Sequence, residues 1–195
     1  MPRTSGTAVS RATSIAAAAF AVIAISGCAF SHKAPPDGAT RAIAYLQDTL
    51  GREIGQVHLT ERPGTRGVEV EVNIERGATP GQHGIHFHDV GKCDSASKYA
   101  SAGGHFNPTG RKHGMLSAEG PHAGDLESIT VDDFRQAHFV WSDTRITLTP
   151  GPTSLFDANG SAIVLHALPD DQRTDPSGNS GARIACGVVA MQKPT

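Results

Sequence analysis

The stretch RGVEVEVNIE (residues 66–75) alternates apolar and polar side chains at every position from 68 to 74. Its apolar members are three valines and one isoleucine, all β-branched, and they occupy the even-numbered positions. Successive side chains of a β-strand point to opposite faces, so one face of this segment is apolar and the other is polar. The pattern predicts a strand with one buried face.

Similar patterns on both sides of this stretch predict an all-β protein. The other expected strands are 41–49, 53–61, 83–90, 126–132, 134–142, 160–168 and 182–191. The chain has 22 glycines and 12 prolines, residue types that favour turns between short strands. About eight strands predict an antiparallel sandwich or a closed barrel. Two long, weakly hydrophobic linkers, 91–125 and 169–182, are predicted to carry function, because structureless segments of that length are uncommon in compact domains.

The overall composition narrows the class of function. A length of 195 residues predicts one domain, with or without appendages. The 17 Lys and Arg residues nearly balance the 19 Asp and Glu residues, so no basic surface argues for a nucleic-acid partner. Hydrophobic residues make up 38% of the chain and charged residues 18%, which is typical of a folded domain.

The N-terminal segment is predicted to lie outside the domain. Arg3 and Arg11 precede the apolar run IAAAAFAVIAI (15–25), which has the length of a signal-peptide core and is short for a membrane span. The run ends in ISGC, which resembles the lipobox of bacterial lipoproteins. We therefore expect a signal peptide over 1–27, a lipid anchor on Cys28, a tether over 28–39 and the folded domain over 40–195. A conventional secretory signal with an incidental cysteine is the alternative.

The expected lipid on Cys28 would attach the protein to a membrane, because each buried CH₂ group contributes about 0.8 kcal/mol. Such a protein would reside in the bacterial cell envelope, in the periplasm or on the outer face of the cell membrane. Cys93 and Cys186 would then form an even pair in an oxidising compartment, where a disulfide is the simplest state. In the chain-entropy view a bridge over so long a loop contributes about 4 to 5 kcal/mol. Two free thiols or two metal ligands are the alternative.

The segment HGIHFHDV (83–90) contains three histidines, two of which can act together. His86 and His88 are separated by one residue, so both imidazoles point to the same face of a strand. Two rings at that spacing can share a metal ion. A pair of ordinary surface histidines is the alternative explanation for this motif when it is taken alone.

The first long linker supplies a more specific set of donors, namely His105, His113, His122 and Asp125. Three imidazoles and one carboxylate form a closed tetrahedral set that suits Zn²⁺. His166 lies in the apolar stretch AIVLHAL (162–168), where an imidazole without a partner would be costly. A core histidine with an ordinary hydrogen bond is the alternative for that position.

Six motifs occur together in one order: HGIHFHDVG, SAGGHFNP, RKHG, HAGDL, VLHA and GARIACGVV. In this combination the chain resembles the copper/zinc superoxide dismutases, from about Thr40 to Met191. The resemblance implies an all-β fold, an eight-stranded Greek-key β-barrel of immunoglobulin-like sandwich type, with two long functional loops. It also implies an oxidoreductase that converts superoxide into O₂ and H₂O₂, with one copper and one zinc ion per subunit.

The resemblance also assigns roles to individual residues. Copper would be bound by His86, His88, His105 and His166, and zinc by His105, His113, His122 and Asp125. In this scheme His105 bridges both metals and delivers a proton during turnover, and Asp170 links His86 to His113 from behind. Arg183 would stand beside copper and attract the anionic substrate. The donor chemistry agrees, since imidazole nitrogens suit Cu(II) and a His₃Asp tetrahedron suits Zn(II).

The chain departs from the eukaryotic pattern of that family in two places. Cys93 directly follows HDVGK, an arrangement that resembles the bacterial envelope branch. The second loop is shorter than in eukaryotic members, so their substrate-steering residues do not carry over, and Arg173 is a candidate for the positive charge there. His83 is expected to be structural. No metal role is expected for His32, His58 and His138.

Two other classes of function are alternatives to an enzyme of this family. One is a copper-binding or copper-delivery module of the same fold without turnover, which loss of Arg183 or of a copper histidine would favour, and none is lost. The other is a zinc hydrolase, which needs an open coordination position and a general base, and no such base stands out. The sequence leaves a homodimer open.

Overall fold

The computed structural model describes residues 1–2 and 37–193, and all strands lie in the unit His32–Thr195. Almost all of the predicted signal peptide, Cys28, His32 and most of the predicted tether lie outside the described residues. Within the described ranges, no helix is long and apolar enough to cross a bilayer.

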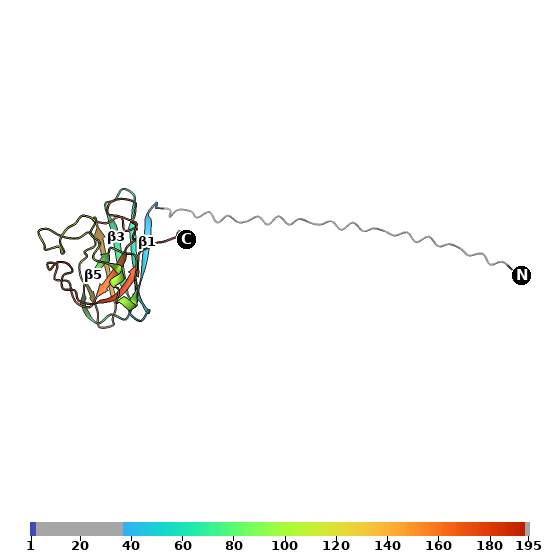
Figure 1. The fold of residues 1–195 in the computed structure, drawn as a ribbon, viewed down its shortest axis with the longest axis horizontal. Coiled ribbons are helices and arrows are strands. Elements are labelled where there is room, and N and C mark those ends of the chain that lie inside the picture. Colours follow the sequence, from blue (N-terminus) through green and yellow to red (C-terminus); the bar gives the residue numbers. More distant parts are fainter. Residues whose placement is uncertain (3–36, 194–195) are drawn as a thin grey trace. The chain divides into compact units, whose positions relative to one another are not determined.

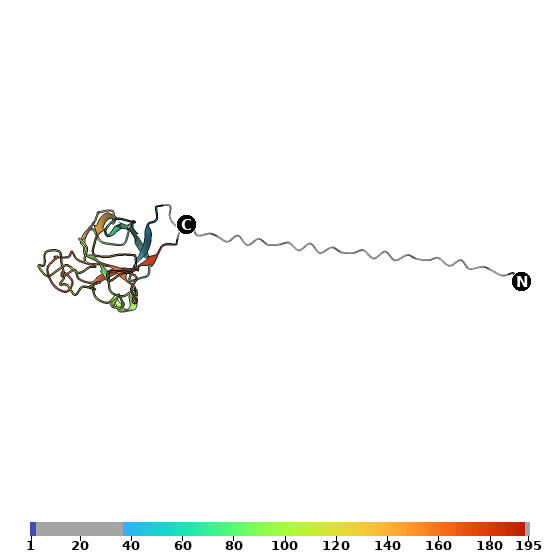
Figure 2. The ribbon, with the colours of Figure 1, turned by 90° about the horizontal axis from the view of Figure 1, so that it is seen from above.

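The domain is built from short antiparallel strands joined by long loops. The elements in chain order are β1 (Thr40–Asp48), β2 (Glu53–Glu61), β3 (Val68–Ile74), β4 (Gly81–His83), β5 (Ile85–His88), the 3₁₀ turns η1 (Ser95–Ser97) and η2 (Ala100–Ala102), β6 (Ile129–Val131), β7 (Ala137–Asp143), β8 (Ala162–His166), β9 (Arg183–Val188) and β10 (Ala190–Met191). The strands curl around a common interior, and the long loops extend to one side of them (Figure 1, Figure 2).

The main sheet follows the order β5-β8-β9-β1-β2-β3-β7, with β10 paired to β1, and every pairing is antiparallel. β4 and β6 form a separate two-stranded sheet that links the two ends of this order. β6 continues into β7 through a turn in which Asp132 N donates to Gln136 O at 2.9 Å, and β4 leads into β5 through Gly84. With β4–β5 and β9–β10 each taken as one interrupted strand, the predicted barrel-type all-β fold is confirmed.

The predicted strand 83–90 differs from the structure, because the chain changes partners at Gly84. β4 pairs with β6 before this glycine, and β5 pairs with β8 after it. Gly84 N donates to Leu168 O, and Gly84 O accepts from His166 N, both at 2.8 Å. A Cβ atom at Gly84 would lie only 2.9 Å from Ser180 Cβ, so a glycine is needed for this close approach. Alternation along the sequence does not reveal such a change of partner.

Strand β5 is buried on both faces, for different reasons on each face. Ile85 and Phe87 belong to the hydrophobic interior of the barrel, to which the valines of β3 also contribute. His86 and His88 point outward but are fully buried, because the loops after β5 and β8 cover them. The alternation of apolar residues and histidines in this strand therefore separates the barrel core from a second buried layer.

Cys93 and Cys186 form the predicted disulfide, with their Cα atoms 5.6 Å apart. Cys186 lies on β9, opposite Gln47 of β1 and Val164 of β8. The bridge therefore attaches the loop that follows β5 to the middle of the main sheet. That loop carries three of the predicted metal-binding histidines.

Candidate metal centre

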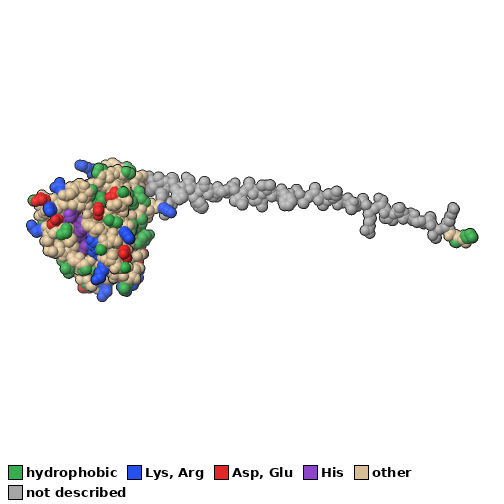
Figure 3. Space-filling model, in the orientation of Figure 1, with side chains coloured by type: hydrophobic (Ala, Val, Ile, Leu, Met, Phe, Trp, Pro, Cys, Tyr) green, Lys and Arg blue, Asp and Glu red, His purple; other side chains and the backbone are tan. Residues whose placement is uncertain are grey.

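Four histidines converge on the outer side of β5 and β8. His86 and His88 come from β5, His166 ends β8, and His105 comes from the long loop, where it forms an isolated β-bridge with His88. Each offers one ring nitrogen, and these nitrogens all lie within 4.8 Å of one another. The group His86, His88, His105 and His166 is called the four-histidine group below. Figure 3 shows histidine side chains reaching the surface in a small patch that borders basic side chains.

The inward-facing nitrogens of the four-histidine group have no hydrogen-bond partner among the described residues. They are Nδ1 of His86 and Nε2 of His88, His105 and His166, and all of them are buried. A buried polar atom without a partner costs free energy, so four such atoms in one place need a ligand. A metal ion that accepts their lone pairs fits this arrangement, and several imidazole nitrogens suit copper.

The other nitrogen of each ring is held by the protein. His88 Nδ1 lies 3.1 Å from Gly103 O, and His166 Nδ1 lies 3.3 Å from Gly181 O. His86 Nε2 lies 2.7 Å from Asp170 Oδ2. Partners of this kind fix the tautomer and the orientation of a metal-binding imidazole.

A second group of donors surrounds one oxygen of Asp125. His105 Nδ1 lies 2.8 Å from Asp125 Oδ1, and the Nδ1 atoms of His113 and His122 each lie 3.1 Å from it. The other oxygen, Oδ2, accepts from the backbone N–H groups of Gly114 and His122. A tetrahedron with metal–ligand distances of about 2.0 Å has edges slightly longer than 3 Å. The group His105, His113, His122 and Asp125, called the His₃Asp group below, therefore has the spacing and chemistry that zinc requires.

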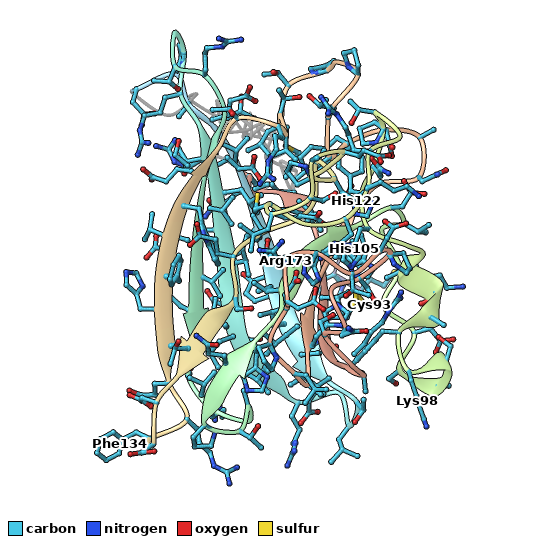
Figure 4. All side chains as sticks on the ribbon, turned by 90° about the vertical axis from the view of Figure 1, so that its left-hand side faces the viewer. Cys93, Lys98, His105, His122, Phe134 and Arg173 are labelled. Atoms are coloured by element: carbon cyan, nitrogen blue, oxygen red, sulfur yellow. A yellow bond between two sulfur atoms is a disulfide. The ribbon has the colours of Figure 1, made fainter. Side chains whose placement is uncertain are left out.

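His105 belongs to both groups through different nitrogens. Its Nδ1 faces Asp125 in the His₃Asp group, whereas its Nε2 is one of the unpartnered atoms of the four-histidine group. A single imidazole ring therefore separates the two sites. Figure 4 shows His105, His122 and Cys93 together on the loop side of the strands, away from Phe134 in the turn between β6 and β7.

Asp170, in the loop after β8, contacts one histidine of each group through a different carboxylate oxygen. Its Oδ2 contacts His86 at 2.7 Å, and its Oδ1 contacts His113 Nε2 at 3.0 Å. Gly178 lies directly against this carboxylate with φ +62°, and a Cβ atom there would overlap Asp170 Oδ1. The loop can therefore close over Asp170 only with a glycine at that position.

Burial keeps the four-histidine group neutral. It lowers the pKa of His88 well below its usual value, that of His105 to about 4 and that of His166 to about 3. It also lowers the pKa of His86, against the opposing effect of its hydrogen bond to Asp170. A neutral imidazole offers a lone pair at neutral pH, which is the state a metal ion binds.

The His₃Asp group is charged in the absence of metal. Burial lowers the pKa of His113, but the hydrogen bonds to Asp125 and Asp170 outweigh it and raise that pKa to about 9. Burial alone would raise the pKa of Asp125, yet the hydrogen bonds from the three imidazoles hold it far below its usual range. The carboxylate is therefore ready to bind a cation, whereas His113 must release a proton when it does so.

Arg183, the first residue of β9, lies opposite His166 of the four-histidine group in the β8–β9 pairing. Its Nη1 donates to Tyr99 O and its Nη2 donates to Gly103 O, both at 2.6 Å. Gly103 O is also the acceptor for His88 Nδ1, so one carbonyl links Arg183 to a predicted copper ligand. Partial burial lowers the pKa of Arg183, but a guanidinium remains charged at any relevant pH.

The structure thus brings together all the predicted copper and zinc ligands, with Asp170 and Arg183 in contact with them or their acceptors. The predicted steering residue Arg173 is exposed, and its backbone N–H donates to Asp171. His83 faces two backbone carbonyls, those of His166 and Thr79, and joins neither group. Sequence reasoning missed Arg145, which pairs with Asp143 and donates from Nη2 to Asp125 O at 2.6 Å. Contacts to backbone carbonyls leave no pattern in the sequence that could have indicated them.

The β-barrel carries a four-histidine group and a His₃Asp group on its outer side, beneath the loops. One imidazole joins the two groups, so this arrangement defines a protein with two adjacent metal sites. The sequence model of the copper/zinc superoxide dismutase family matches residues 53–189, and the chain belongs to this family. It is therefore an oxidoreductase that uses copper and zinc and converts superoxide into O₂ and H₂O₂.

Individual relatives agree with this assignment. The chain is 41% identical over 150 residues to the Cu-Zn superoxide dismutase 2 of Aquifex aeolicus, which covers 76% of this chain and 86% of that protein. It is 37% identical over 151 residues to the Cu-Zn superoxide dismutase of Caulobacter vibrioides, covering 76% and 84%. A crystal structure of a SOD-like protein from Bacillus subtilis superposes with a TM-score of 0.71 at 31% identity, covering 76% and 97%.

Because His105 has one nitrogen in each group, replacing it should affect both metals. We expect His105→Ala to lose copper and zinc together, His122→Ala to lose mainly zinc, and His166→Ala to lose mainly copper. Elemental analysis of purified protein after metal loading measures both contents. His138→Ala, at an exposed histidine of β7, is the matched control and should bind both metals fully. Full zinc content in His105→Ala would contradict a shared ligand.

The lowered pKa values of the four-histidine group make the metal-free protein sensitive to acid. A histidine whose pKa is lower in the folded state stabilises the fold above its unfolded value of about 6.5, and this contribution is lost as the pH falls toward the folded pKa. With folded values of about 4 for His105 and about 3 for His166, we expect the free energy of unfolding to fall by at least about 2 kcal/mol between pH 6.5 and 4.5.

Urea titrations of the metal-free protein across that range measure the effect. His113 has the opposite sign, because its raised pKa stabilises the fold below pH 6.5 and loses this effect only as the pH rises toward about 9. It therefore does not mask the acid effect. A free energy of unfolding that stays constant from pH 6.5 to 4.5 would contradict the assigned neutral state of the buried imidazoles.

Proposed function

We propose that the four-histidine group holds the copper ion and the His₃Asp group holds the zinc ion, one of each per subunit. The observation that carries this proposal is His105, whose Nδ1 and Nε2 lie in different groups. Four imidazole nitrogens suit copper, and three imidazoles with one carboxylate suit tetrahedral zinc. Asp170 supports both sites, because its two oxygens hold His86 and His113 in place.

When bound, copper would supply the one-electron redox chemistry by which one superoxide ion is oxidised and another is reduced. The residues around it provide orientation and protons. His105 would be able to carry a proton on Nε2 whenever that nitrogen binds no metal, because Nδ1 alone faces Asp125. The carbonyls of Gly103 and Gly181 keep His88 and His166 aligned throughout.

Arg183 is proposed to attract and orient the substrate anion. Its guanidinium donates only to backbone carbonyls and forms no ion pair within residues 37–193, so its positive charge is not neutralised locally. The net charge of the chain is −2. Attraction of an anion therefore has to come from local positive charge beside the site. A planar guanidinium also presents donors in a fixed geometry to a small anion.

We also propose that the protein acts in the bacterial cell envelope, anchored by lipid on Cys28, and protects it from external superoxide. The ISGC motif at the end of the apolar run supports the anchor. The Cys93–Cys186 disulfide is the kind of bond that persists in oxidising compartments, which supports export.

Replacing Arg183 distinguishes a superoxide dismutase from a copper-binding protein without turnover. We expect Arg183→Ile to keep both metals and to lower the second-order rate with superoxide about tenfold or more, since one charge-assisted contact contributes about 1.5 to 3 kcal/mol. Arg183→Lys should keep part of the rate, because it keeps the charge without the planar fork. The assay uses superoxide from xanthine oxidase, with cytochrome c reduction as the competing reaction.

Two controls accompany this experiment. Arg76→Ile removes an exposed arginine paired with Glu75, outside both donor groups, and should leave the rate unchanged. The wild-type rate should fall as salt rises, because electrostatic attraction is screened over about 10 Å at 0.1 M. Undiminished turnover in fully loaded Arg183→Ile would remove this residue from the mechanism. A metal-loaded wild type without any turnover would instead favour a copper carrier.

Replacing Cys28 tests the anchor. We expect Cys28→Ser to move the protein from the membrane fraction into the soluble fraction of the envelope, with both metals still bound. Immunoblots of fractionated cells and elemental analysis measure the two quantities. Membrane association that persists in Cys28→Ser would contradict lipid attachment at this residue.

A further inference from the structure

The orientation of Arg183 depends on the backbone of the loop that follows β5. Its Nη1 contacts Tyr99 O, and its Nη2 contacts Gly103 O. Gly103 O also contacts Nδ1 of His88, so a residue of the four-histidine group helps to hold this carbonyl in place. Tyr99 O has no such link to a donor group; it accepts from Ala102 N at 3.1 Å, so its position depends on what holds this turn against the sheet.

Tyr99 has a backbone conformation that is unusual for a residue with a side chain. Its φ and ψ are 63° and 16°, and those of the preceding Lys98 are 52° and 41°. Both residues lie in the left-handed region, which is unfavourable for L-residues other than glycine. Two consecutive residues in this region persist only when the surrounding structure holds them there.

Backbone hydrogen bonds shape this turn locally, and the side chain of Tyr99 attaches it to the sheet. This side chain is 1% exposed and packs in a small apolar cluster with Ala102, Val164 and Cys186, separate from the barrel core. Its hydroxyl donates to Gln47 O on β1 at 2.8 Å. Gln47 is the cross-strand neighbour of Cys186. The hydroxyl and the disulfide therefore attach the same loop to adjacent points of the sheet.

We infer that Tyr99 is a positioning residue for Arg183, which it aligns through its own carbonyl oxygen; this rests on the proposed role of Arg183. The disulfide secures only Cys93, near the start of the loop. The hydroxyl bond to Gln47 secures the loop midway between Cys93 and His105. With the hydroxyl removed, the left-handed turn at Lys98 and Tyr99 can relax, and Tyr99 O then turns away from Nη1.

The substitution Tyr99→Phe removes the hydroxyl and keeps the buried ring. We expect unchanged copper and zinc contents, an intact disulfide, and a second-order rate with superoxide lowered about two- to tenfold, the range set by one lost hydrogen bond. The chain has two tyrosines, and Tyr45 is 49% exposed on β1. Tyr45→Phe is therefore the matched control and should behave as wild type.

A second readout does not depend on turnover. Phenylglyoxal reacts with arginine side chains, and its rate of reaction with Arg183 in the metal-loaded protein is measured by peptide mass analysis. A guanidinium released from Tyr99 O is less well held, so we expect faster modification of Arg183 in Tyr99→Phe than in wild type or Tyr45→Phe. Equal modification rates in all three proteins, together with an unchanged turnover rate, would overturn the inference.

A double mutant separates positioning from a general structural role. If Tyr99 acts through Arg183, adding Tyr99→Phe to Arg183→Ile should cause no further loss of rate, whereas independent effects would multiply. A further loss in the double mutant would overturn the inference. Full activity of Arg183→Ile alone would refute the proposed role of Arg183. The phenylglyoxal comparison would still decide whether Tyr99 holds that side chain.

Discussion

The rest of this structure depends on one arrangement. The six imidazoles of the four-histidine group and the His₃Asp group are buried in contact with one another. Such a cluster is unfavourable in an empty protein, because the inward nitrogens of the four-histidine group find no protein partner and burial opposes their protonation. The protein supplies acceptors only to the outward nitrogens, and so it orients the rings without satisfying them. Metal binding offsets the remaining cost, and this couples metal affinity to the stability of the loops that cover the site.

Those loops are joined to each other as well as to the barrel. Gln172, two residues after Asp170 in the loop after β8, accepts from Met115 N and donates to Leu126 O in the loop after β5. Asp175 accepts from the backbone N–H of His113. Arg145 connects the carbonyl of Asp125 to Asp143 at the end of β7. A disturbance of the His₃Asp group is therefore expected to reach Asp170, and through it His86 of the four-histidine group.

Much of this architecture could be predicted from local sequence patterns. The alternation in β3 indicates a half-buried strand directly, and the spacing of His86 and His88 indicates two rings on one face. The break at Gly84 could not be predicted, because it depends on the approach of Ser180 and Leu168 from a distant loop. The contacts of Tyr99 and Arg145 were missed for a related reason. Both act on backbone carbonyls, and every residue has a carbonyl whatever its side chain.

Strand β5 has a consequence for folding as well as for chemistry. Its side chains alternate between the barrel core and the metal centre, with His86 opposite Val164 and Phe87 opposite Ile163 of β8. A slip of one residue would move both imidazoles into the apolar interior and turn Phe87 toward the loops. Only the correct register can bind metal, and a ligand that binds one state stabilises that state. Metal binding therefore adds its free energy to the same register that burial of Phe87 in the apolar core favours.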